Sequence, residues 1–219
     1  MAVPGIILRL AQPKDDSTSL PPDAVLAPPR IVPGIEGFFV FEAQDDLTPK
    51  YNTTYFISDI RPVLESSSYF DEDVKKNGDQ LASLAWEVAS FINGRDTIQQ
   101  KELTSEPHLL PKPPAIGSTL ISNGGTPADG WDQDYNDWYN KEHSAALSLV
   151  PGWNNGRRYK HEKAYGGADY ASWYGWNYYD AENGLYGPEW QASMTPWTEK
   201  VRGHGRKPNL RRVWKVLRN

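Results

Sequence analysis

Val32-Pro33-Gly34-Ile35 and Val150-Pro151-Gly152-Trp153 are two versions of one short motif, 118 residues apart in a chain of 219 residues. The segments after the two copies are also alike. The stretches 37–42 and 156–162 both have the composition of a strand, and a further strand is expected after each, at 53–60 and 170–179. A repeat at this spacing predicts two copies of one structural unit.

Each half also predicts a second helix and a closing strand. In the first half, the segment 79–92 carries an apolar stripe with helical spacing and ends at Asn93-Gly94, so we expect a helix there. In the second half, a helix is expected from Pro188, with an interruption at Pro196. Opening strands at 5–10 and 118–122 and closing strands at 97–103 and 210–217 complete the pattern. Both halves then have the order β-α-β-β-α-β, an α+β fold.

The first helix differs between the halves. Residues 131–149 form an amphipathic pattern, whereas the matching part of the first half contains five prolines, namely Pro13, Pro21, Pro22, Pro28 and Pro29. A helix interior does not accept proline, so this helix is expected to be lost or shortened. The proline-rich stretch 106–114 is the expected linker between a first unit, 1–105, and a second unit, 115–219.

The composition excludes several classes of function. The chain has no cysteine, which removes disulfides and thiol chemistry. No stretch has the ~20 apolar residues of a membrane span, and no secretory signal opens the chain, so we expect a cytoplasmic protein without a membrane partner. A net charge of −5 argues against a nucleic-acid partner. Eight of the nine tryptophans lie between 131 and 214, which predicts an aromatic cavity in the second half.

The most specific signal is the segment from Tyr135 to His143. Tyr135, Tyr139 and His143 are four residues apart and therefore lie along one helix face, with Trp138 beside them. If that face packs on the sheet, His143 is a titratable group in an aromatic cavity, suited to proton transfer. The other interpretation is a core histidine bonded to a backbone carbonyl, with the tyrosines as packing. The sequence leaves both open.

The predicted strands supply further candidates. In 170–179, alternation places Ser172, Tyr174, Trp176 and Tyr178 on one face, and Trp173, Asn177 and Tyr179 on the other. Either face could line the cavity. On the preceding strand, Tyr159 and His161 share a face opposite Arg158. That arginine could hold a substrate carboxylate, although pairing with a surface carboxylate is the commoner use.

At these residues the sequence resembles a known family. The run Tyr-x-x-Trp-Tyr-x-x-x-His at 135–143, Val-Pro-Gly at 150–152 and Arg-Arg-Tyr at 157–159 is similar to the EthD-like proteins of fungal and bacterial secondary metabolism, within the dimeric α/β-barrel superfamily. The match covers 135–159 well and the rest of the second half by element order. The resemblance implies two tandem ferredoxin-like units that close a barrel within one chain or across a homodimer.

The resemblance also implies a cofactor-free enzyme that acts on a small aromatic or polyketide-type metabolite. As a lyase or isomerase it would decarboxylate, dehydrate, cyclise or isomerise that metabolite. Oxygen-dependent conversion of an anthrone to a quinone is a further reaction that the resemblance implies. The implied catalytic residues are His143, Tyr139 and Tyr135. The residues expected to bind the substrate are Trp138, Trp173, Trp176, Tyr174, Tyr159, His161 and Arg158. No metal is expected, because histidines 108, 143, 161 and 204 lack ligand spacing. The alternatives are a non-catalytic ligand-binding or stress-response barrel, and a structural assembly protein.

Overall fold

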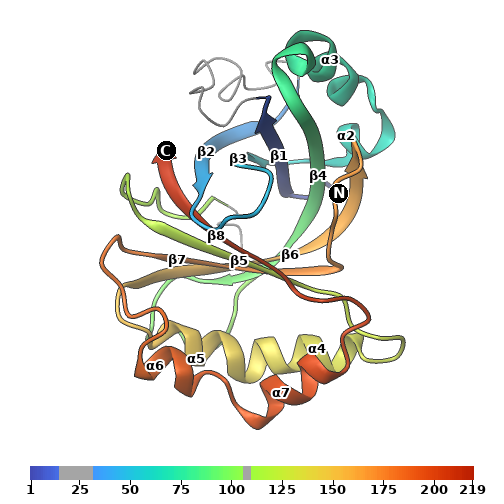
Figure 1. Cartoon of the computed structure of the whole chain (residues 1–219). Coiled ribbons are helices and arrows are strands. Elements are labelled where there is room, and N and C mark those ends of the chain that lie inside the picture. The colour runs from blue at the N-terminus through green and yellow to red at the C-terminus, as the bar shows by residue number, and fades with distance from the viewer. Residues whose placement is uncertain (15–31, 106–109) are drawn as a thin grey trace.

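The strands of the chain form one closed antiparallel barrel. The computed structural model describes residues 1–14, 32–105 and 110–219, and within them eight strands succeed one another around the barrel in the order β1-β3-β2-β8-β5-β7-β6-β4. Each half of the chain therefore supplies four neighbouring strands, and the barrel closes within one chain (Figure 1). The strands are β1 (Gly5–Pro13), β2 (Ile35–Ala43), β3 (Tyr51–Ile57), β4 (Leu81–Arg95), β5 (Thr119–Gly125), β6 (Trp153–Tyr165), β7 (Trp173–Tyr179) and β8 (Leu210–Arg218).

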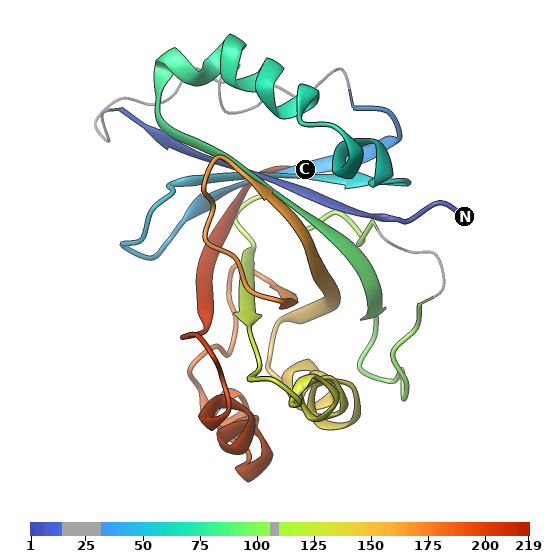
Figure 2. The ribbon, with the colours of Figure 1, turned by 90° about the vertical axis from the view of Figure 1, so that its right-hand side faces the viewer.

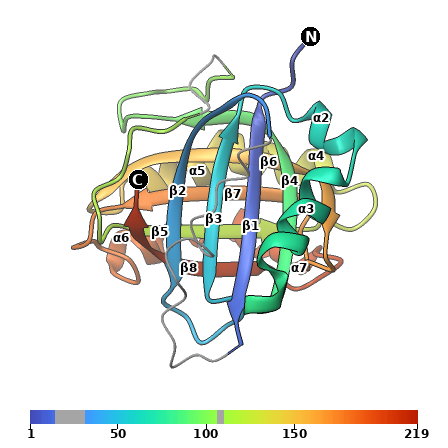
Figure 3. The same ribbon diagram turned by 90° about the horizontal axis from the view of Figure 1, so that it is seen from above.

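Helices cover the outside of the barrel on two sides. Helices α2 (Arg61–Glu65) and α3 (Ser68–Asn77) lie against the sheet of β1 to β4, and a single 3-10 turn at Gly78–Gln80 comes after them. Helices α4 (Asp132–Trp138), α5 (Ser144–Ser148), α6 (Pro188–Ala192) and α7 (Pro196–Gly203) lie on the far side, below the sheet of β5 to β8 (Figure 2). Seen from above, the strands of the first half run across those of the second (Figure 3).

The prediction of a helix over 79–92 is wrong, because this segment is most of strand β4. It pairs with β1 on one side and β6 on the other, so long-range pairing on both edges overrides the local helical spacing. Trp86 and Val88 face outward toward α3, while Ala89 faces the barrel interior. The closing strand predicted at 97–103 is also absent: Gln100 turns back to Thr97, and only an isolated bridge joins Gly94 to Thr104.

The predicted helix of the second half is confirmed. Helices α4 and α5 are joined by a π-helical turn, Tyr139–His143, so the backbone is helical from 132 to 148. The break at Pro196 is also confirmed, because that residue opens α7. The prolines at 21, 22, 28 and 29, and His108 in the linker, lie outside the described residues.

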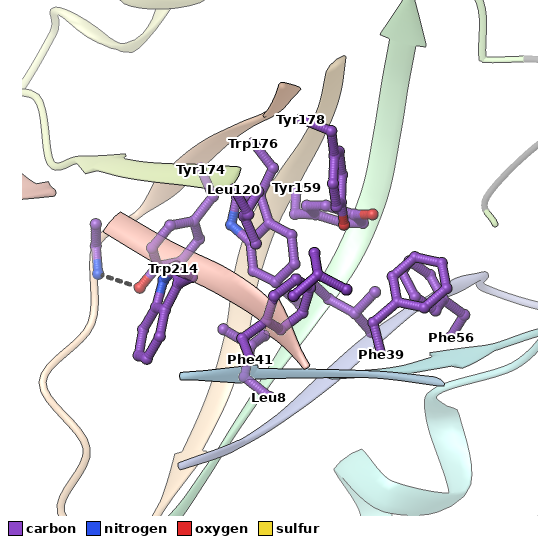
Figure 4. Packing of buried hydrophobic residues seen from close by; sticks show 14 residues of the cluster. Leu8, Phe39, Phe41, Phe56, Leu120, Tyr159, Tyr174, Trp176, Tyr178 and Trp214 are labelled. Carbon is purple, nitrogen blue, oxygen red and sulfur yellow. Dashed lines mark hydrogen bonds between the residues drawn. The ribbon is translucent and has the colours of Figure 1, made fainter. Parts of the chain in front are cut away.

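The barrel interior is filled with apolar and aromatic side chains. Strand alternation sends one set of residues inward, and Figure 4 shows how they interlock. The largest are Phe39, Phe41, Phe56, Tyr159, Tyr174, Trp176, Tyr178 and Trp214. Their rings meet edge to face, as Phe41 does with Trp176 at 6.4 Å between ring centroids. The concentration of aromatic residues therefore divides between the barrel core and the helix layer.

Two glycines let the helix layer approach the sheet. A Cβ atom on Gly175 would lie 2.4 Å from the Tyr139 hydroxyl oxygen, and one on Gly125 would lie 2.6 Å from the Tyr135 hydroxyl oxygen. The rings of both tyrosines therefore rest directly on bare backbone. This contact sets the distance between the helices and β5 and β7.

We predict that Gly175→Ala displaces the Tyr139 ring and lowers the free energy of unfolding by about 1–3 kcal/mol. Gly203→Ala is the matched control, since a Cβ there meets nothing within 4 Å and this exposed residue ends α7. We expect it to be neutral or stabilising by up to about 1 kcal/mol. Urea unfolding measures both; equal midpoints would contradict this account of the packing.

Candidate functional site

Strand β7 sends the predicted site residues to opposite sides of the sheet. Tyr174, Trp176 and Tyr178 face the barrel interior. Trp173 and Tyr179 face outward and pack beneath the helices. The predicted residues therefore do not form one cavity: Tyr135, Trp138, Tyr139, His143, Arg158 and Trp173 lie in the helix layer, and Tyr159, Tyr174 and Trp176 lie inside the barrel.

His143 is buried in the helix layer. Its ring stacks on Trp138 at 4.2 Å, and the hydrogen bond that it makes is to the backbone of Ser193, while Nδ1 has no partner among the described residues. Burial, reinforced by the positive charge of Arg202, lowers the pKa of His143 to about 3. The imidazole is therefore neutral at physiological pH. This geometry matches the interpretation of a core histidine bonded to a backbone group.

Arg158 is held by neutral groups. Its guanidinium donates to the side-chain oxygens of Asn136 and Asn140, each at 2.7 Å, and lies 4.5 Å from the ring centroid of Tyr139. The side chain is buried, and burial lowers its pKa. The expectation of a carboxylate partner at the surface is wrong, because α4 and the π turn cover the guanidinium and supply amide oxygens instead.

Little open space remains beside these residues. Tyr139 accepts a hydrogen bond from Asn177 at 3.1 Å, and Trp173 donates to Asp132 at 2.7 Å. The cavity bounded by Tyr139, His143 and Asn177 measures about 40 Å³. That is room for a few water molecules at most.

A much larger cavity opens at one end of the barrel. This cavity, called the first opening below, has a volume of about 430 Å³, within the range of small-molecule sites. Its apolar wall is Leu8, Leu10, Leu210 and Trp214. Its rim consists of the β2–β3 loop at 47–49 and the β6–β7 turn at 166–169. Arg212 fixes the first of these loops by donating to Asp45 and to the carbonyls of Leu47, Thr48 and Pro49.

A buried carboxyl group lines the first opening. Glu87, on β4, is 2% exposed, and its Oε1 lies 2.9 Å from Nδ1 of His161 on β6. The Tyr174 hydroxyl hydrogen-bonds to the same carboxyl group and accepts from the backbone N–H of Ala171 at 2.8 Å. Burial raises the pKa of Glu87, and the bonds from His161 and Tyr174 oppose that rise. The His161 ring is stacked on Tyr170 at 4.0 Å between centroids, which fixes its orientation.

Two further polar groups line the same cavity. Asn52 is fully buried; its Oδ1 accepts from Thr54 at 3.1 Å, while Nδ2 has no partner among the described residues. Ser122 accepts from Trp214 Nε1 at 2.9 Å, which fixes that ring against the cavity. A buried N–H group without a partner is costly, so Asn52 offers a donor to whatever fills the opening.

Sequence reasoning missed Glu87 and Asn52. It identified His161 and Tyr174, which form the polar cluster with Glu87, but it placed Glu87 inside a predicted helix. The available signal was the alternation of Trp86, Glu87 and Val88, in which a polar residue separates two apolar ones as in a strand. Asn52 shows no such pattern, because its inward orientation depends on the register of β3 in the barrel.

The part of the chain that the structure describes has neither a metal-binding cluster nor a membrane-spanning helix. Over residues 1–14, 32–105 and 110–219, no three His, Asp or Glu side chains are grouped so that they could hold a metal ion. The helices in the same ranges are all too short or too polar to cross a bilayer.

His143 makes stability depend on acid pH. Its pKa is about 3 in the folded chain against 6.5 when unfolded, so the unfolded chain binds the extra proton as pH falls and stability is lost between these values. The full effect is roughly 4 to 5 kcal/mol at about 1.36 kcal/mol per unit. We predict that His143→Phe flattens the fall in unfolding free energy between about pH 7 and pH 4. An unaltered slope in His143→Phe would refute the assignment.

Comparisons with known proteins give the fold. No protein-family model matches the sequence, and no curated protein matches it. Among solved structures, an anthrone oxidase-like protein is similar over 99% of this chain and 92% of its own, with a TM-score of 0.59 and 11% identity. A candidate monooxygenase from Fusobacterium nucleatum has a TM-score of 0.59 and 12% identity, over 99% of this chain and 94% of its own. A candidate chlorite dismutase has a TM-score of 0.58 and 8% identity, over 99% of this chain and 96% of its own. The chain thus shares the α/β-barrel fold of these solved structures.

Proposed function

We propose that the chain is an enzyme that moves a proton on a small aromatic or polyketide-type metabolite bound in the first opening, with Glu87 as the acid–base group. The observation that carries this proposal is a buried carboxyl group, paired with His161, on the wall of a 430 Å³ cavity. Carboxyl groups with pKa values shifted by burial, next to a cavity, are typical of catalytic sites.

The cavity wall suits a flat ligand with one oxygen atom. Leu8, Leu10 and Trp214 supply apolar and aromatic surface, and Asn52 Nδ2 supplies a hydrogen-bond donor. In the proposed step, ionised Glu87 takes a proton from a carbon next to a ligand carbonyl. The electrons of the broken C–H bond move to the carbonyl oxygen, which Asn52 stabilises as it becomes negative. Return of the proton to another carbon would isomerise the ligand.

The enolate formed in this step is common to the reactions that the EthD-like resemblance implies, although decarboxylation reaches it by loss of CO₂ and then needs Glu87 as an acid. Isomerisation, dehydration, cyclisation and decarboxylation can all pass through such an enolate without a cofactor, which would make the protein a lyase or isomerase of fungal secondary metabolism. The anthrone oxidase-like and monooxygenase neighbours favour a second candidate, in which oxygen reacts with the same enolate. A catalytic role for His143, Tyr139 and Tyr135 stays a prediction. The space beside these residues, about 40 Å³, suits a ligand less well than the 430 Å³ of the first opening.

We also propose that the chain is a tandem duplication of one structural unit. Strands β4-β1-β3-β2 and β8-β5-β7-β6 have the same order in the two halves, which supports two tandem ferredoxin-like units, 1–105 and 115–219 with a linker between them. The first opening takes residues from both halves, for example Glu87 and Tyr174. We therefore propose that one chain holds the complete site and that a homodimer is not required.

Glu87→Gln tests the catalytic role. We expect it to slow exchange of the acidic C–H protons of anthrone or 2-tetralone with deuterium, measured by NMR, by about 100-fold or more, because the amide cannot accept the proton. Binding of the same probes, measured by tryptophan fluorescence, should change little. Glu65→Gln, at an exposed position on α2, is the control. Binding without accelerated exchange in the native protein would favour a non-catalytic ligand-binding barrel.

The pH dependence of the exchange rate in His161→Phe tests whether His161 acts on Glu87. The bond from His161 lowers the pKa of Glu87, so its removal raises that pKa further. The rate of proton abstraction depends on ionised Glu87 and rises with pH through the pKa. We predict that the midpoint of this rise moves to higher pH in His161→Phe, while the stack on Tyr170 is kept. A midpoint that stays in place would mean that His161 does not act through Glu87.

A further inference from the structure

We infer that the opposite end of the barrel holds a second site, which binds the carboxylate of a small organic acid. At this end, β6 and β7 present inward-facing residues in adjacent register positions, Asn155 beside Tyr178 and Arg157 beside Trp176, with Tyr159 next along β6. These five side chains form the second-site cluster. They extend from the ends of β6 and β7 that are remote from the 166–169 turn of the first opening to the middle of both strands.

Every member of the cluster has a buried polar atom without a partner. The atoms are Asn155 Oδ1, Arg157 Nε, Tyr159 Oη, Trp176 Nε1 and Tyr178 Oη, and none of them has a hydrogen-bond partner among the described residues. Each of these residues is at most 5% exposed. Buried polar groups are normally satisfied, so five such atoms on one patch of two strands indicate a missing partner.

The unpartnered atoms are mainly donors. The hydroxyls of Tyr159 and Tyr178 lie close together in Figure 4, at the other end of the aromatic cluster from the Tyr174 hydroxyl. Arg157 already uses Nη1 on the carbonyl of Gly156 and Nη2 on Asp96, which leaves Nε unused. Burial raises the pKa of both tyrosines, so they remain O–H donors. Two neighbouring hydroxyls and a guanidinium N–H fit an oxyanion, and the Trp176 ring beside them can report on its binding.

A cavity borders the cluster at two of its residues, Asn155 and Arg157. Its volume is about 620 Å³, and Lys112 is part of the same wall. Asp96 and Asp180 also line the cavity and balance the positive charges of Arg157 and Lys112 before a ligand enters. The free Arg157 Nε in this wall, with the tyrosine hydroxyls behind it on β6 and β7, therefore selects a single carboxylate beside an apolar body. A multiply charged phosphate would be repelled by Asp96 and Asp180.

Tyr178→Phe and Tyr159→Phe test the site. Each removes one hydroxyl that has no partner among the described residues of the free protein. We expect both variants to keep or raise the urea midpoint of the free protein, and each to weaken binding of acetate, benzoate or 2-naphthoate about five- to twenty-fold. Binding is measured by the NMR signal of the Trp176 indole N–H. Tyr165→Phe is the matched control: its hydroxyl is buried and bonds to the carbonyl of Val63, so it should lose stability and leave binding unchanged.

Three outcomes would overturn the inference. One is that none of the three acids shifts the Trp176 signal when its concentration is ten times a Kd of about 1 mM. Another is unaltered affinity in both tyrosine variants; a urea midpoint that is lowered as well would assign the cluster to structural water. The third is tighter binding of inorganic phosphate than of benzoate, which would contradict the choice of a carboxylate. Glu87→Gln should leave this binding intact, so the second site and the proposed acid–base function can fail separately.

Discussion

Strands β4 and β6 pair from Trp86 with Tyr165 to Arg95 with Gly156, and this pairing joins the two halves of the chain along one seam of the barrel. The other seam, between β2 and β8, is much shorter. The long seam brings Glu87 of the first half to His161 of the second, 74 residues away in sequence. Without it, the carboxyl group would be solvated and its pKa would not be raised by burial.

Closure of the barrel gives the strands two buried faces with different contents. The inner face of β6 and β7 holds Tyr159, Tyr174, Trp176 and Tyr178, and the outer face holds Arg158, Trp173 and Asn177 under the helices. The outer layer is closely packed, with glycines where the tyrosine rings meet the sheet. Aromatic side chains fill the middle of the barrel interior, and the cavities of about 430 and 620 Å³ lie toward its two ends. The alternating aromatic residues of β7 thus contribute both to the helix layer and to the barrel core.

Much of the fold was predictable from local sequence, and less of the site. Turns and helix ends are determined by nearby residues. Local sequence therefore indicates the right elements at the repeated Val-Pro-Gly motif, in the amphipathic pattern at 131–149 and at the prolines 188 and 196. The segment 79–92 was misassigned because its apolar residues fit a helix as well as a strand, and only pairing with β1 and β6 decides between them. Tyr174 and His161, two of the predicted substrate-binding residues, both bond to Glu87. The positions of Glu87 and Asn52 depend on barrel register, which no local pattern contains. The motif at 135–143 correctly indicated a buried aromatic cluster around His143, but sequence spacing could not show how little space remains beside it.

The central claim is that a ligand binds inside the barrel, at Glu87, and not beneath the helices, at His143. The most direct measurement is a crystal structure of the protein soaked with anthrone or 2-tetralone. The account predicts that the ring lies against Trp214, with its oxygen within hydrogen-bond distance of Asn52 Nδ2 and its acidic carbon facing Glu87. Density for the ring beside His143 and Tyr139, with the first opening empty, would contradict it.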